Sequence, residues 1–112
     1  MSELANRICD PSQTGDAPLK GAALEGLHAK LGGDWQVIEA HHLQKNYAFS
    51  NFAEALAFVN QVGALAEEIG HHPDIYFTWG KARIEILTHS LDGLSEPDFI
   101  LAAKIDALPA AS

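Results

Sequence analysis

Three histidines occupy positions from which they could move protons. His71 and His72 are adjacent and directly precede Pro73, and His89 follows Thr88 at the end of a strand-like run. Imidazole is the side chain whose ordinary pKa, about 6.5, lets it gain or lose a proton near neutral pH. The three histidines are therefore candidate catalytic residues for acid–base chemistry or, alternatively, candidate ligands of a metal ion.

Two carboxylates are candidates to orient these imidazoles. Glu67 lies one turn before a predicted helix end, and Asp98 lies in the first turn of the last predicted helix. Each also has a purely structural explanation. Asp98 stands three residues after Ser95, the spacing of a capping box, and Glu67 could be an ordinary exposed residue. His71 could simply follow a helix C-terminus, whose dipole favours imidazolium.

Other kinds of chemistry have weaker support in the sequence. Neighbouring side chains in an extended segment point to opposite sides, so His71 and His72 rarely reach one ion, and the H-E-x-x-H pattern of helical zinc sites is absent. No G-x-S-x-G nucleophile motif occurs, and the single cysteine, Cys9, lies in a polar N-terminal segment. The pattern therefore favours acid–base chemistry over a metal site, with a purely structural role for these histidines as the open alternative.

The elements that would position the histidines follow from hydrophobic spacing. A helix is predicted from Asn51 to Ile69, with Asn51 as its cap and Gly70 as its left-handed end, which places His71 and His72 in the exit loop. Strands are predicted at 35–40, 43–49, 75–79 and 81–89, where residues alternate, with a hairpin join near residues 40–42. Further helices are predicted at 18–31 and 95–107.

This order predicts an α+β fold, with a single four-stranded antiparallel sheet and three helices packed on one face. His28, His41 and His42 fall on a helix and in a hairpin turn, so we assign them structural roles. From the pattern alone, we interpret Trp35 and Trp79 as packing residues rather than as platforms for a ligand. Residues 1–17 are polar and punctuated by proline and glycine, and we expect a flexible N-terminal arm there.

Composition narrows the classes of function. The chain has 112 residues, enough for one domain, and its net charge of −8 disfavours nucleic acid as a partner. One cysteine excludes an intramolecular disulfide framework and fits a reducing compartment. We see no signal peptide and no apolar run of about 20 residues that could span a membrane. We expect a cytoplasmic protein.

Three segments of the chain carry a specific pattern of residues. The pattern consists of Glu67, His71, His72, Pro73 and Asp74; Trp79, Lys81, Ile84, Ile86, Thr88 and His89; and Gly93, Leu94, Asp98, Leu101, Ala102, Ile105 and Asp106. This pattern resembles that of the pterin-4a-carbinolamine dehydratase family. The resemblance covers roughly residues 18–107, and upstream matches at Trp35, Leu43, Phe49 and the start of the 52–58 helix support it. The family often has Trp at the position of Ile75 and Asn at that of Gly80.

The resemblance implies a single dehydratase-like domain at residues 18–112 and a hydro-lyase that acts on 4a-hydroxytetrahydropterin in tetrahydropterin recycling. It implies no metal or bound cofactor, a homodimer or homotetramer, and functional coupling to an aromatic amino acid hydroxylase. His71, His72 and His89 would be catalytic, whereas Glu67, Asp98, Pro73 and Trp79 would bind or orient the substrate. We expect His71 and His89 to act as acid and base, and His72 mainly to hold the pterin ring.

Two other functions stay open on the same fold. Some relatives are assembly or regulatory partners, including a transcriptional coactivator and a factor in Rubisco assembly, and such a protein could dispense with the histidines. A dehydratase of another pterin, for example one linked to molybdenum cofactor metabolism, is the other alternative, because the expected chemistry lies on the ring that all pterins share.

Overall fold

The computed structural model describes residues 3–111 of the chain. The longer elements occur in the order α1 (Gly21–Leu31), β1 (Gln36–Ile38), β2 (His42–Ala48), α2 (Phe52–Ile69), β3 (Asp74–Thr78), β4 (Lys81–Ile86) and α3 (Glu96–Asp106). Three short 3-10 helices are η1 (Leu4–Asn6), η2 (His89–Leu91) and η3 (Pro109–Ala111). Within residues 3–111, no helix is both long enough and apolar enough to cross a membrane.

The strands form a single four-stranded antiparallel sheet with the order β1-β2-β4-β3. The register pairs Leu43 with Ile86 across β2 and β4, and Asp74 with Glu85 across β3 and β4. Ala82, Ile84 and Ile86 of β4 are buried, whereas the residues between them are not. The predicted α+β class is confirmed, because the alternating pattern gives the sheet one apolar face for the helices to cover.

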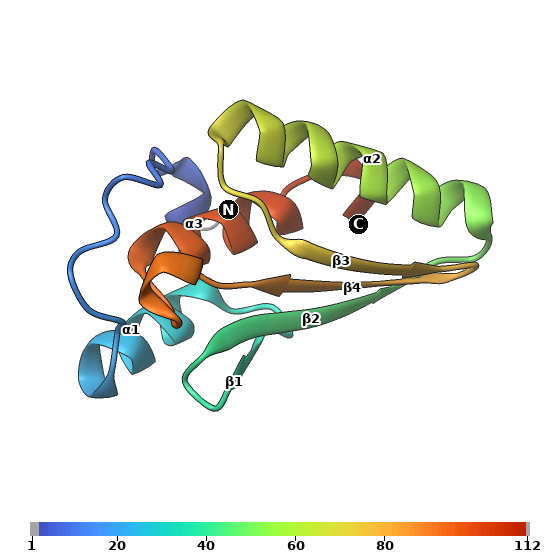
Figure 1. Ribbon diagram of the computed structural model, residues 1–112. Helices are drawn as coiled ribbons and strands as arrows, with labels where there is room; N and C mark the ends of the chain where they lie inside the picture. Colours follow the sequence, from blue (N-terminus) through green and yellow to red (C-terminus); the bar gives the residue numbers. More distant parts are fainter. Residues whose placement is uncertain (1–2, 112) are drawn as a thin grey trace.

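Helix α2 lies along that apolar face of the sheet (Figure 1). It begins after Asn51, whose side chain accepts a hydrogen bond from the backbone NH of Glu54 at 2.9 Å. It ends at Gly70, whose φ of 82° is left-handed. A residue other than glycine is strained in this conformation. Both ends of α2 are as predicted, so the exit loop carries His71 and His72.

Helix α3 is buried on nearly every side. It contacts β2, α1 and η1, and every residue from Pro97 to Ala103 is buried. A helix that is apolar all round belongs in the core rather than on the surface. The centre of the domain is therefore α3, and α1 packs against this helix.

Two strand ends differ from the prediction. The hairpin turn consists of Glu39, Ala40 and His41, with φ values of 53° and 57° at the first two, and His42 already belongs to β2. The strand predicted to reach His89 ends at Ile86, because Thr88 turns back and its backbone NH bonds the carbonyl of Gly93 at 2.8 Å. Alternation continues through this turn, so the pattern alone does not locate the strand end.

The N-terminal segment packs against α3. Leu4 is fully buried in the core, and Lys104 of α3 donates a hydrogen bond to the carbonyl of Ala5 at 2.9 Å. Cys9 is also buried, and its thiol donates to the carbonyl of Pro97 at 3.4 Å. Flexibility of the predicted arm at residues 1–17 stays a prediction, and residues 1 and 2 lie outside the described residues.

Candidate active site

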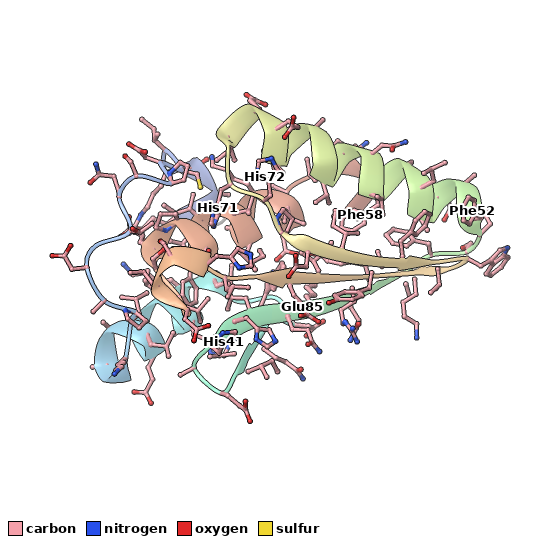
Figure 2. All side chains as sticks on the ribbon, viewed as in Figure 1. His41, Phe52, Phe58, His71, His72 and Glu85 are labelled. Carbon is pink, nitrogen blue, oxygen red and sulfur yellow. The ribbon has the colours of Figure 1, made fainter. Side chains whose placement is uncertain are left out.

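One cavity of about 370 Å³ brings together all three predicted catalytic histidines. It lies where β3 begins and β4 ends, and Figure 2 shows His71 and His72 at the start of the segment that leads into β3. Three segments contribute the walls: the N-terminal arm, the exit loop of α2, and the turn after β4. The lining residues are Pro11, Thr14, Gly70, His71, His72, Pro73, Asp74, Leu87, Thr88, His89 and Ser90.

Asp98 holds His71 in a fixed position. Its Oδ1 lies 2.6 Å from Nε2 of His71, and the Asp98 side chain is completely buried. The other oxygen, Oδ2, accepts from the hydroxyl of Thr88 at 2.7 Å and from the backbone NH of Ser95 at 2.8 Å. Because one oxygen caps α3 and the other binds His71, the structural and orienting roles of Asp98 coexist.

Thr88 and Ser95 extend this buried network. Their hydroxyl oxygens lie 2.6 Å apart, and both side chains are buried. Since Thr88 donates its proton to Asp98, its oxygen is left to accept from Ser95. This chain of hydrogen bonds joins the turn after β4 to the start of α3 and fixes the carboxylate that faces His71.

His72 has a more exposed partner. Its Nε2 lies 2.5 Å from Oε2 of Glu67, one turn before the end of α2, and the two side chains are 59% and 78% exposed. The Asp98 partner of His71 is fully buried, and His71 itself is 11% exposed. Exposed pairs of this kind contribute little to stability because water screens them. His71 is therefore the more firmly positioned of the two adjacent histidines.

His89 lines the cavity from η2, and its side chain makes no hydrogen bond to another part of residues 3–111. Pro73 lines the cavity as well and ends any continuation of α2. Trp79, in contrast, lies in the turn between β3 and β4 at the other end of the sheet. It is 66% exposed and does not line the cavity. The structure thus separates Trp79 from the other predicted site residues.

The remaining histidines lie outside this cavity. His28 contacts the carbonyl of Trp35 at 2.8 Å, and Trp35 is buried with its indole NH donating to Asp106. His41 and His42 contact each other at the start of β2, with 3.0 Å between their Nδ1 atoms. Among residues 3–111, no three histidine, cysteine or acidic side chains form a cluster suited to a metal ion.

Sequence reasoning missed two parts of the site. Thr88 alternates in the sequence with the apolar residues Ile84 and Ile86, and a buried hydroxyl needs a hydrogen-bond partner, so the sequence does carry a signal for its bond to Asp98. No sequence signal marks Pro11 and Thr14 as cavity residues, because they are distant in sequence from every histidine and lie in a polar segment with no periodicity.

The family model described as pterin 4 alpha carbinolamine dehydratase matches residues 17–108. The chain belongs to this family. Among relatives of the dehydratase family, a protein of Rubrobacter xylanophilus is 56% identical over 108 residues, which cover 96% of this chain and 100% of that protein. A protein of Alkaliphilus metalliredigens is 45% identical, covering 95% of this chain and 96% of its own length. The names of both proteins call them pterin-4-alpha-carbinolamine dehydratases, and both names mark that assignment as provisional.

Two solved structures of dehydratase-like proteins share the fold. A transcriptional coactivator/pterin dehydratase from Brucella melitensis superposes with a TM-score of 0.76 at 26% identity, covering 85% of this chain and 99% of that one. A pterin dehydratase-like protein identified as a RuBisCO assembly factor in the alpha-carboxysome gives 0.61 at 31% identity, covering 73% and 96%. The dehydratase fold therefore occurs in proteins described with enzymatic and with non-enzymatic roles.

Proposed function

We propose that this protein is a hydro-lyase that converts 4a-hydroxytetrahydropterin into quinonoid dihydropterin and water by histidine acid–base catalysis. The observation that carries the proposal is that one cavity holds both His71, oriented by the buried Asp98, and His89, whose side chain has no hydrogen-bond partner within residues 3–111. At about 370 Å³ the cavity falls within the range of about 300–1,000 Å³ that is usual for small-molecule sites.

The reaction needs one proton delivered and one removed. The bond between C4a and its hydroxyl oxygen breaks as that oxygen takes a proton and leaves as water. The proton on N5 departs, and its electron pair forms the double bond between N5 and C4a. Two imidazoles can perform these transfers near neutral pH, and each positioned group contributes about 10²–10⁴-fold.

The geometry favours His71 and His89 as this pair. With Asp98 accepting from Nε2 of His71, the Nδ1 atom is left for the substrate, as an acceptor in neutral imidazole and as a donor in imidazolium. His89 makes no hydrogen bond within residues 3–111 that a substrate would have to displace. His72, with its exposed partner Glu67, would mainly hold the pterin ring. Pro73 would supply part of the wall.

Single alanine variants of the histidines test these roles. Dehydration of freshly generated 4a-hydroxytetrahydropterin is followed by its ultraviolet change, with wild type, His71→Ala, His72→Ala and His89→Ala side by side. We expect kcat to fall about 10²-fold or more for His71→Ala and His89→Ala, and KM to rise for His72→Ala. Near-normal kcat in the first two, with loss in His72→Ala, would invert the assignment.

A matched histidine outside the cavity serves as the control. His28→Ala removes an imidazole whose only hydrogen-bond partner within residues 3–111 is the backbone carbonyl of Trp35. We expect its kcat and KM to stay near wild type. Equal, uncatalysed rates for wild type and all variants would exclude the dehydratase function.

A binding or assembly role is the second candidate, because a structural relative at 31% identity is described as a RuBisCO assembly factor. Such a role needs no set of three histidines in one cavity, so we rank it below the enzyme. A stoichiometric partner in pull-downs, together with absent dehydration, would favour it. Comparing pterins with different C6 side chains would test whether the substrate is instead another pterin.

Cytoplasmic location, homo-oligomerisation and coupling to an aromatic amino acid hydroxylase complete the proposal. Strand β3 is an edge of the sheet, and an unpaired edge offers backbone groups to a second copy. Light scattering after size-exclusion chromatography distinguishes a monomer from a dimer or tetramer.

A further inference from the structure

The N-terminal arm forms one wall of the histidine cavity. Pro11 and Thr14 line it together with His71, His72 and His89. Both arm residues are half-buried, whereas the neighbouring residues 12, 13 and 15 are exposed. The arm therefore turns these two side chains, and not the ones between them, toward the site.

Contacts on the arm before this turn hold it against α3. Leu4 is fully buried, and the buried thiol of Cys9 donates to the carbonyl of Pro97. Pro97 directly precedes Asp98, the partner of His71. The arm is thus fastened beside the same helix turn that orients the catalytic candidate, so its position relative to His71 is defined by the core.

A closed turn shapes the part of the arm that faces the cavity. Oδ1 of Asp10 accepts from the backbone NH of Ser12 at 2.9 Å and from its hydroxyl at 2.6 Å. The backbone NH of Gln13 bonds the carbonyl of Asp10 at 2.9 Å, and Pro11 has a fixed φ between them. A wall built this way loses little conformational entropy when a ligand binds.

The chemistry of the two lining side chains limits what they can do. Proline and threonine have no group that titrates near neutral pH, so they can contribute to binding but not to proton transfer. Pro11 offers an apolar surface to a flat ring. The hydroxyl of Thr14 bonds only the neighbouring carbonyl of Gly15 within the described chain, at 3.3 Å, which leaves it available to a ligand.

We infer that Thr14 is a substrate-binding residue that hydrogen-bonds the bound pterin, and that Pro11 packs against the pterin. This inference rests on the proposed dehydratase function. It predicts an effect on KM rather than on kcat, since the arm touches the substrate but not the groups that move protons.

Kinetics of Thr14→Val test the hydrogen bond, because valine keeps the shape and removes the hydroxyl. We expect KM for 4a-hydroxytetrahydropterin to rise about 3- to 10-fold with kcat within about 2-fold of wild type. Thr14→Ser restores a hydroxyl and should recover most of the affinity. Gln13→Ala is the matched control, since its exposed side chain lies in the same turn but outside the cavity lining.

Thiol labelling tests the same contact without relying on activity. In Thr14→Cys, 7,8-dihydrobiopterin should slow modification by a maleimide at least 5-fold, whereas Gln13→Cys should be modified at the same rate with and without the pterin. Wild type is the blank. Its one cysteine, Cys9, is buried, and burial raises the pKa of that thiol to about 11, so it reacts slowly.

The outcomes separate this inference from the function on which it rests. If wild type catalyses dehydration but Thr14→Val keeps its KM, or if the pterin fails to protect Thr14→Cys, the role of Thr14 is wrong and the dehydratase function stands. If wild type neither dehydrates the substrate nor binds 7,8-dihydrobiopterin, the function itself is wrong, and the role of Thr14 with it.

Discussion

His71 and Asp98 are joined by a 2.6 Å contact in which a fully buried carboxylate meets a cavity-lining imidazole. The same carboxylate caps α3 through its other oxygen. Helix α3 is the centre of the core, so the position of His71 is set by the most buried element of the fold. We expect changes at Asp98 to affect both activity and stability.

Asp98→Asn should lower kcat by about 10- to 100-fold, because the charge facing His71 is lost. This is part of the roughly 10²–10⁴-fold that a positioned acid or base contributes to the rate. It should also lower the free energy of unfolding by about 1–3 kcal/mol, since an amide group cannot accept at both oxygen positions. Steady-state kinetics and urea denaturation measure the two effects.

Ser95→Ala is the matched control for that experiment. It removes a hydroxyl of the same network that contacts Thr88 and Oδ2 of Asp98 but neither His71 nor Oδ1, the oxygen that faces His71. We expect a similar loss of stability with kcat within about 3-fold of wild type. Equal losses of kcat in both variants would mean that Asp98 acts only through the stability of α3.

Glu67→Gln should have a much smaller effect. Its contact with His72 lies at the surface, where ion pairs contribute at most about 1 kcal/mol. We expect kcat and KM to stay within about 5-fold of wild type, and any effect to shrink as salt is added. A loss of kcat as large as that of Asp98→Asn would assign Glu67 a direct part in proton transfer.

Much of this fold was predictable because it depends on local spacing. The apolar stripe of α2, its cap at Asn51 and its end at Gly70 involve neighbours in the chain, so the sequence indicates where His71 and His72 must lie. The capping spacing of Ser95 and Asp98 is equally local. Local spacing also locates the helix ends that carry His71 and Asp98, which makes both residues candidates, but their meeting across 27 residues depends on the tertiary fold.

Contacts between distant segments were harder to predict. Pro11 and Thr14 reach the cavity only because Leu4 and Cys9 anchor the arm to α3, and no periodicity marks such an anchor. Glu39 and Ala40 take left-handed conformations in the hairpin turn, although Asn and Gly are the usual residues there. Strand pairing, rather than local preference, imposes that turn.

Tyr47→Phe tests a second, partly buried network, which lies outside the histidine cavity. Asp106 accepts from the hydroxyl of Tyr47 at 2.5 Å, from Lys45 at 2.8 Å and from the indole of Trp35 at 2.9 Å. Burial, and then the bond to Asp106, raise the pKa of Tyr47. We expect the variant to lose about 1–2 kcal/mol of unfolding free energy with kcat and KM unchanged. A kinetic change would link this network to the site.

Acid should open the turn of the arm. Hydrogen bonds from the hydroxyl and then the backbone NH of Ser12 hold the pKa of Asp10 below its ordinary value. A carboxyl group whose pKa is lowered by folding stabilises the folded form fully above its unfolded pKa, about 3.9, and loses that contribution as the pH falls through its folded pKa. The protection of the Ser12 amide, measured as its hydrogen-exchange rate relative to the intrinsic rate at the same pH, should therefore fall below about pH 4.

Asp10→Asn provides the comparison for the acid experiment. Its side chain can still accept a hydrogen bond but does not titrate, so the protection of the Ser12 amide should lose its dependence on pH. The same pH dependence in both proteins would show that another group opens the turn.

The central position of α3 has a consequence for how the chain folds. The β4 isoleucines Ile84 and Ile86 and the buried Leu4 belong to one core with α3, which is the last long element to be made. A growing chain that ends before residue 96 would expose this apolar surface, and exposed surface of this kind promotes aggregation during synthesis. Protection by chaperones should therefore matter most in the interval between completion of the sheet and arrival of its final helix.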